Sequence, residues 1–285
     1  MNVINSCSIY QSKEKLKRKN TSSEEMTVLA TFGYGFIAFG PVAALFLVTV
    51  ARQAHEIIIV MSSAFFWLTS LLLSSIIWSI VPPLYDTPAF TLPFSVLLQE
   101  FFRWAFYRLI RRVDRLLEVL SEDKSQRRKH KVAYVSGMGF GLISGVVAFA
   151  NILQSSGGPG VVGVVNRGSQ YFVLSSAFGA NIMIILHVCW GVVYFDGWEM
   201  LHRDGLTNLT KGTLHGYFNV LLVIASHMAI SLLSLLNQSL PPTYFLVASY
   251  AMALFLIGYS LHLAGARIGT LKHFVALSNS CDKQM

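Results

Sequence analysis

Charged residues are scarce in this sequence and make up only 13% of its 285 positions. A soluble domain averages about a quarter charged residues and somewhat under half apolar ones. Here 54% of the residues are apolar, and the mean hydropathy is +0.55. The composition therefore argues against a soluble globule and predicts that lipid surrounds most of the chain.

Cysteine is also rare. Cys7, Cys189 and Cys281 lie far apart and fit no CxxC or Cys/His spacing, which excludes a disulfide scaffold and a zinc module. We predict three free thiols, with neither a metal nor a cofactor site. The net charge of +8 does not point to nucleic acid, because the basic residues interrupt apolar runs instead of covering one face of a soluble fold.

Seven apolar runs are long enough to cross a bilayer, for which a helix needs about 20 residues. They are Val28–Val50, Ile57–Val81, Ala89–Ile110, Val132–Leu153, Tyr171–Phe195, Leu214–Leu236 and Tyr244–Ala266. Backbone groups in lipid must be hydrogen-bonded within the segment, and these runs are too long for barrel strands. We therefore predict an all-α membrane protein with seven transmembrane helices. Pro93 lies near the start of the third, where proline is tolerated.

Lysine and arginine gather on one side of the predicted helices. They crowd the stretch from Arg108 to Lys131, whereas Arg167 stands alone on the opposite side once residues 1–25 are set aside. The positive-inside rule therefore places the C-terminus in the cytosol and the start of the first helix in the lumen or outside. Three parts are predicted: a disordered basic leader (1–25), a seven-helix domain (26–266) and a cytosolic tail (267–285). The leader has no apolar core, so it is not a signal peptide.

The stretch after the third run predicts an amphipathic helix over Arg108–Leu120. Apolar residues recur there three and four positions apart, with arginines between them. Such a helix would continue the third one along the membrane surface, where its basic face is either solvated or in contact with lipid headgroups.

Three glycines of the fourth predicted helix, Gly137, Gly141 and Gly145, are four residues apart. Each step of four turns a helix by about 400°, so these glycines line a slightly twisting groove. Another helix can pack into such a groove with close backbone contact. That helix could belong to this chain or to a partner, and the sequence leaves both open. A side chain larger than alanine at Gly141 is expected to push the helices apart.

Ionisable side chains also occur inside the predicted spans. His187 and His227 lie in the fifth and sixth, neither of which holds a carboxylate at the same depth. We interpret them as neutral imidazoles hydrogen-bonded between two helices, in preference to a proton carrier or a catalytic base. Gln99, Glu100 and Arg103 of the third span need partners as well. Glu100 and Arg103, at i and i+3, are predicted to neutralise each other.

Protease motifs are missing. The sequence has no GxGD, and no aspartate lies inside a predicted span, so the chain is not expected to be an aspartyl intramembrane protease. A rhomboid-like serine protease would pair Ser136 or Ser144 with His227, but neither serine lies in a GxSG motif. A seven-helix receptor or small-solute transporter is the remaining alternative, although DRY-like and NPxxY motifs and an internal repeat are not seen.

Six sequence blocks, taken together, are specific enough to compare with known families. They are FGYGFIAFGPVAALFLVTVA (32–51), FFWLTSLLLSSIIW (65–78), SVLLQEFFRWAFYRLIRR (95–112), AYVSGMGFGLISGV (133–146), GPGVVG (158–163) and LHVCWGVVYFD around His187. These blocks closely resemble the anterior-pharynx-defective family, the seven-helix scaffold subunit of γ-secretase. The likeness runs from Met26 to about the end of the seventh helix.

The resemblance implies a non-catalytic subunit with a lumenal N-terminus and a cytosolic C-terminus. Family members bind nicastrin and hold presenilin, which supplies the catalytic aspartates, and the presenilin enhancer subunit completes the complex. It cleaves single-pass membrane proteins such as Notch and amyloid precursor protein, in the endoplasmic reticulum, Golgi and plasma membrane.

The resemblance also implies roles for individual residues. The family's glycine motif, associated with assembly, matches Gly137, Gly141 and Gly145. Its two intramembrane histidines, implicated in assembly and activity, match His187 and His227. The sequence departs from the family pattern in two places. One is the leader before Met26, and the other is a connection from Val81 to Pro93 that is shorter than expected.

Overall fold

The computed structural model describes residues 29–80, 88–120, 126–156, 170–206, 210–235 and 241–265. These ranges form an N-terminal helix (Leu29–Thr49), α2 (Ala54–Ile80), α4 (Pro88–Leu120), α5 (Gln126–Ser156), α6 (Gln170–Asp204), α7 (Lys211–Leu235) and α8 (Pro242–Leu263). The predicted all-α class is confirmed for this part of the chain. The leader, the first part of the shortened connection and the tail lie outside the described residues.

Six of the seven helices in the described ranges are long and apolar enough to cross a membrane, so the chain is a multi-pass membrane protein. The exception is α4, whose apolar half contains Gln99, Glu100 and Arg103 and is therefore less hydropathic than the others. The crossing of the bilayer by Ala89–Ile110, and with it the count of seven spans, stays a prediction. The orientation of the termini also stays a prediction.

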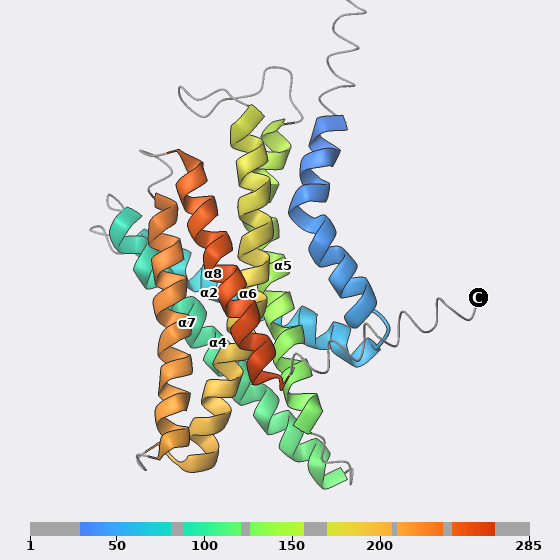
Figure 1. Ribbon diagram of the computed structural model, residues 1–285, viewed down its shortest axis with the longest axis vertical. Helices are drawn as coiled ribbons and strands as arrows, with labels where there is room; N and C mark the ends of the chain where they lie inside the picture. Colours follow the sequence, from blue (N-terminus) through green and yellow to red (C-terminus); the bar gives the residue numbers. More distant parts are fainter. Residues whose placement is uncertain are drawn as a thin grey trace, which may run out of the picture.

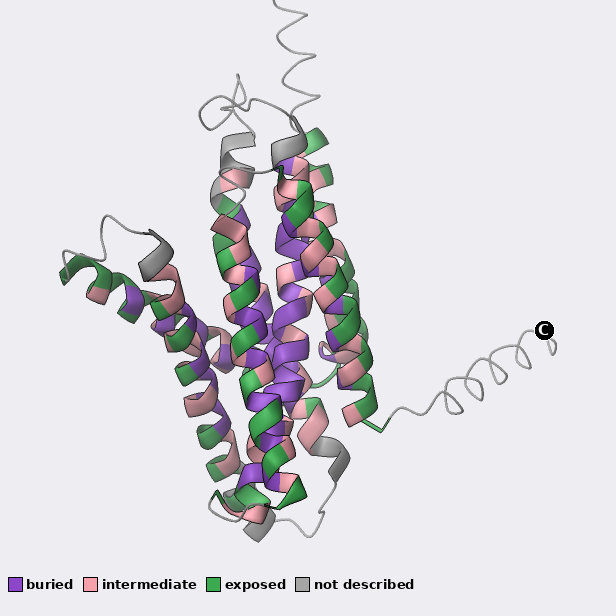
Figure 2. Cartoon of the chain, turned by 60° about the vertical axis from the view of Figure 1, so that its left-hand side comes forward, coloured by how far each residue is buried: buried purple, intermediate pink, exposed green. Residues whose placement is uncertain are grey.

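Helix α6 lies at the centre of the bundle and packs against α5, α7 and α8 (Figure 1). In its most apolar stretch 78% of the residues are buried, compared with 11% in the N-terminal helix and 17% in α8. Figure 2 shows the buried residues concentrated on the central helices. Since lipid is as apolar as a protein core, this difference reflects close packing and not polarity.

The N-terminal helix is peripheral and packs on α5 and α6 through Ala38, Phe149 and Ala177. The side-chain amide of Asn181, on α6, donates a hydrogen bond to the backbone carbonyl of Ala38 at 3.1 Å. Pro41 has no N–H for the preceding turn, which weakens the helix there. Asn181 therefore ties this helix to α6 beside its weakest turn.

Helix α4 is 33 residues long and runs obliquely across the bundle (Figure 1). It begins at Pro88, a favoured first position because the missing N–H has no helical partner there. Pro93 lies five residues after this start, one residue deeper than predicted, and removes one backbone hydrogen bond. The helix continues without a break to Leu120, which confirms the predicted helical extension over Arg108–Leu120.

The glycine groove of α5 is filled by α6. A Cβ atom on Gly137 would lie 2.8 Å from the backbone oxygen of Val188, and one on Gly141 would lie 2.7 Å from that of Ile184. Gly191 of α6 in turn faces Gly137. Of the two occupants that the sequence left open, the structure shows a helix of the same chain.

A second close contact lies on another face of α5. There a Cβ atom on Gly139 would overlap Ser63 and the backbone carbonyl of Val60, both on α2. The four-residue spacing that identified the groove does not include Gly139, so the sequence analysis missed it. Glycines thus allow α5 to approach two neighbours closely, α6 on one face and α2 on another.

Candidate functional site

Four ionisable side chains from three helices meet in the interior of the bundle. Glu100 and Arg103 come from α4, His187 from α6 and His227 from α7, and each residue is at most 2% exposed. Their i, i+3 spacing turns Glu100 and Arg103 to the same face of α4. We call these four residues the polar cluster.

Glu100 and Arg103 form the ion pair that their spacing predicted. Arg103 Nε lies 3.2 Å from Glu100 Oε2, which confirms that prediction. Each partner also reaches a histidine. Arg103 Nη2 lies 2.9 Å from His187 Nδ1, and His227 Nδ1 lies 2.6 Å from Glu100 Oε1. The pair on α4 therefore connects α6 with α7.

These contacts assign the proton on each imidazole ring. Arginine only donates hydrogen bonds, so Nδ1 of His187 is an acceptor and, in the neutral ring, Nε2 carries the proton. A carboxylate only accepts, so Nδ1 of His227 carries a proton and donates to Glu100. The two histidines therefore have opposite hydrogen-bonding roles.

We expected each imidazole to hydrogen-bond across to another helix, and the structure places both partners on α4 instead of pairing the two rings. The ring centroids are 5.1 Å apart at an interplanar angle of 82°, an edge-to-face contact, while both hydrogen bonds run to α4. The carboxylates of α6 begin at Asp196, nine residues beyond His187, and α7 has none. The carboxylate that pairs with His227 comes instead from α4, which a single sequence does not place beside them.

Aromatic and hydroxyl groups surround the polar cluster and were missed by the sequence analysis. Trp190 stacks on His227 with a centroid distance of 4.2 Å and donates Nε1–H to Ser226 Oγ at 2.9 Å. Tyr194 donates its hydroxyl hydrogen to the backbone carbonyl of Glu100 at 3.1 Å. Trp190 and Tyr194 follow His187 at i+3 and i+7, which places all three on one face of the helix. This spacing could have identified them as neighbours of His187 from the sequence.

Gln99 lies outside the polar cluster. Its side-chain oxygen accepts a hydrogen bond from Trp67 Nε1 of α2 at 3.0 Å. Adjacent residues on a helix point about 100° apart, so Gln99 and Glu100 serve different neighbours. Between them, these two residues link α4 to α2 and to α7.

The glycine groove and the polar cluster meet at His187. A Cβ atom on Gly137 would lie 2.9 Å from the backbone oxygen of His187, and one on Gly141 would lie 3.2 Å from the His187 Cβ. On the α5 side, the Phe140 ring lies 5.0 Å from the guanidinium of Arg103, at a cation–π distance. The close approach of α5 thus sets the position of the backbone that carries His187.

Ser136, Ser144 and His227 do not form the dyad of a rhomboid-like protease. Ser136 Oγ donates to the backbone carbonyl of Ala133 at 2.9 Å, and Ser144 Oγ donates to that of Gly141 at 2.8 Å. Both hydroxyls thus bind within α5, while His227 binds Glu100. The geometry therefore favours helix-to-helix connection over nucleophilic chemistry.

Replacing His187 by alanine is expected to destabilise the chain more than replacing it by asparagine. Alanine leaves a buried Arg103 N–H group without an acceptor, at a cost of about 1–3 kcal/mol, whereas the asparagine side-chain oxygen can accept the bond. The measurement is the apparent melting midpoint of the purified chain. If asparagine behaved no better than alanine, the acceptor role of Nδ1 would be wrong.

Comparison with known proteins agrees with the sequence resemblance. The family model described as Aph-1 protein matches residues 29–267. The chain is 38% identical over 251 residues to "Gamma-secretase subunit Aph-1" of Drosophila melanogaster, covering 88% of this chain and 99% of that protein. It is 36% identical over 259 residues to "Gamma-secretase subunit APH-1B" of Mus musculus, covering 87% and 93% respectively. The human protein of that name is 43% identical over 183 residues, covering 61% and 71%.

Proposed function

Because the chain belongs to the Aph-1 family, we propose that it is a non-catalytic scaffold subunit of a γ-secretase complex. In this proposal it joins nicastrin and the presenilin enhancer subunit to presenilin, which supplies the catalytic aspartates. The complex would act in the endoplasmic reticulum, Golgi and plasma membrane on single-pass proteins such as Notch and amyloid precursor protein. The observation that carries the proposal is the family match over residues 29–267.

The distribution of burial supports a scaffold. The contacts of the polar cluster lie inside the chain, between α4, α6 and α7. Around that interior, the N-terminal helix, α2 and α8 bury less than a quarter of their most apolar stretch. Their outer faces present large apolar side chains such as Phe36, Phe65 and Leu254. A rigid centre with apolar outer helices suits a subunit that holds other membrane helices.

The glycine groove supports an indirect role in assembly. Gly137, Gly141 and Gly145 lie against α6, so in this proposal they act by keeping the chain's own helices in register. This replaces the simpler idea of a vacant groove that receives a partner helix. Partner subunits would then contact the outer helices, whose positions depend on the α5–α6 seam.

The test is purification of the tagged full-length chain from its native membranes, with quantitative mass spectrometry of whatever accompanies it. We expect presenilin, nicastrin and the presenilin enhancer subunit in fixed ratios. Proteolysis should require the presenilin aspartates and not this chain alone. Cleavage of a peptide, or transport of a solute through liposomes, by the isolated chain would contradict a scaffold role.

A further inference from the structure

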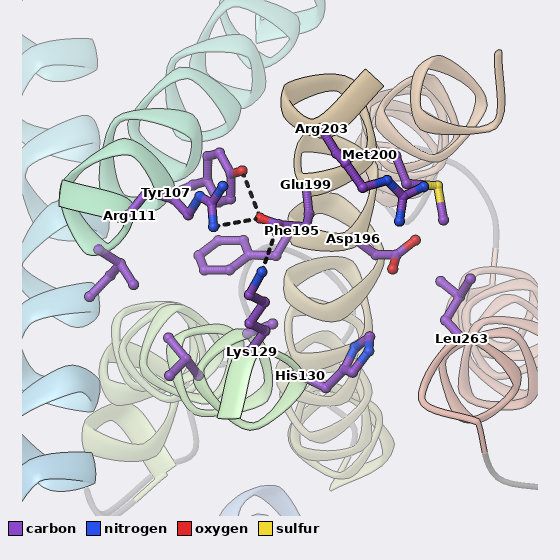
Figure 3. Close-up of a pocket in the computed structure, with 13 residues that line it drawn as sticks. Tyr107, Arg111, Lys129, His130, Phe195, Asp196, Glu199, Met200, Arg203 and Leu263 are labelled. Carbon is purple, nitrogen blue, oxygen red and sulfur yellow. Dashed lines mark hydrogen bonds and ion pairs between the residues drawn. The ribbon is translucent and has the colours of Figure 1, made fainter. Parts of the chain in front are cut away.

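A cavity of about 240 Å³ lies where α5 begins and α6 ends. Its lining is charged on some sides and apolar on others, the latter including Phe195, Met200 and Leu263 (Figure 3). The cavity sits where the basic ends of the helices give way to apolar sequence, the depth at which headgroups lie in a bilayer. It is separate from the polar cluster.

Glu199 on one side of the cavity is already fully engaged. Its carboxylate lies 2.6 Å from Lys129 Nζ and 3.1 Å from Arg111 Nη1, and it accepts a hydrogen bond from the Tyr107 hydroxyl at 3.3 Å (Figure 3). These contacts hold α4, α5 and α6 around the cavity. Lys129 is 40% exposed, and its ammonium group keeps further N–H groups that can donate to a ligand in the cavity.

Asp196 is held in place but has a free oxygen. Its Oδ2 accepts a hydrogen bond from Asn219 Nδ2 at 2.9 Å, and Asn219 accepts one from the Tyr259 hydroxyl at 2.6 Å. Among the residues that the structure describes, no donor reaches Asp196 Oδ1. The carboxylate therefore keeps one acceptor for a cation. His130 and Arg203 line the cavity near it (Figure 3). Arg203 donates its Nε–H to Asp204 at 2.9 Å, which leaves the N–H groups of its two terminal nitrogens for a ligand.

We propose that this cavity binds the headgroup of a phospholipid with a primary ammonium group beside its phosphate, namely phosphatidylethanolamine. The ammonium group donates to Asp196 Oδ1, and the phosphate accepts from Lys129 and Arg203. Phe195 and Leu263 contact the glycerol and the first methylene groups. Acidic and basic side chains in one cavity suit a zwitterion better than an anion.

The test compares three lipids that differ only in the headgroup. Phosphatidylcholine keeps the positive charge but has no N–H donor, and phosphatidylglycerol has the phosphate without a cation. The full chain, with whatever subunits purify with it, is titrated with each lipid in detergent and followed by native mass spectrometry. Phosphatidylethanolamine is expected to bind about tenfold more tightly than the other two, the size of effect typical of one charge-assisted hydrogen bond.

Three variants separate the contributions. Asp196→Asn should remove the preference for phosphatidylethanolamine and leave phosphatidylglycerol binding undiminished, because phosphatidylglycerol has no cation to pair with Asp196 and asparagine still accepts a bond from Asn219. Arg203→Gln should weaken all three lipids alike, since all carry the phosphate. Arg112→Gln is the control, as Arg112 is exposed on α4 and does not line the cavity.

Four results would overturn the proposal. They are equal binding of the three lipids, tighter binding of phosphatidylglycerol, a preference that survives Asp196→Asn, and equally tight binding of soluble phosphoethanolamine. The last would identify a water-soluble ligand and not a membrane lipid. Undiminished phosphatidylglycerol binding by Asp196→Asn shows that the variant is folded, so a loss of preference is not a folding defect.

Discussion

Glu100→Gln alone should destabilise the chain more than Glu100→Gln combined with Arg103→Gln. The two side chains form an ion pair at 3.2 Å, and both are almost completely buried. Removing one charge leaves the other unpaired, which costs about 3–5 kcal/mol in a protein interior, and arginine is also costly at membrane depth. Removing both leaves a neutral pair that can still hydrogen-bond to His187 and His227.

The measurement is a double-mutant cycle on apparent melting midpoints, with the recovery of the other subunits as a second readout. The double variant is expected to regain at least about half of the loss caused by either single one. Arg203→Gln is a useful comparison, because Arg203 forms an ion pair with Asp204 but is 65% exposed, so water can solvate the charge that remains and little stability should be lost. Strictly additive losses at Glu100 and Arg103 would show that the two charges do not stabilise each other.

The features that the sequence predicted correctly depend on geometry within one helix. The ion pair follows from the i, i+3 spacing of Glu100 and Arg103, and the glycine groove follows from a spacing of four. Both hold whatever lies beside the helix. Six apolar runs likewise correspond to helices long and apolar enough to cross a membrane, because length and composition alone decide that property.

The features that the sequence did not predict depend on which helices are neighbours. His227 meets a carboxylate of α4, from which it is separated by 127 positions in the chain. The glycine groove receives α6, and Trp190 stacks on His227 across the α6–α7 contact. All lipid-embedded helices are apolar on the outside, so hydropathy does not say which faces meet.

Helix α4 illustrates the limit of composition as a guide. Gln99, Glu100 and Arg103 lower its hydropathy, yet all three have partners inside the bundle. Polar residues in a membrane helix are tolerated when they face other helices, and those partners come from α2, α6 and α7. The same residues that make the span hard to recognise therefore attach α4 to the rest of the chain.

Gly141→Leu is expected to separate α5 from α6 and to prevent normal accumulation of the folded chain. A Cβ atom at Gly141 would already lie 2.7 Å from the backbone oxygen of Ile184, and backbone cannot move aside as a side chain can. Overpacking of a well-packed interior costs typically 1–3 kcal/mol, and a leucine against backbone belongs at the upper end or beyond. The displacement also moves His187 from Arg103, so recovery of the other subunits should fall with stability.

Gly145 and Gly258 provide matched comparisons. A Cβ atom at Gly145 would meet the Ile184 side chain at 2.6 Å, whereas Gly258 of α8 has nothing within 4 Å. Gly145→Ala should therefore be destabilising alone and largely rescued by Ile184→Ala, because the second change removes the obstructing atoms. The same Ile184→Ala change should not rescue Gly141→Leu, and Gly258→Leu should leave the melting midpoint nearly unchanged. Rescue of Gly141→Leu by Ile184→Ala would show that the seam is held by side-chain packing and not by contact between the two backbones.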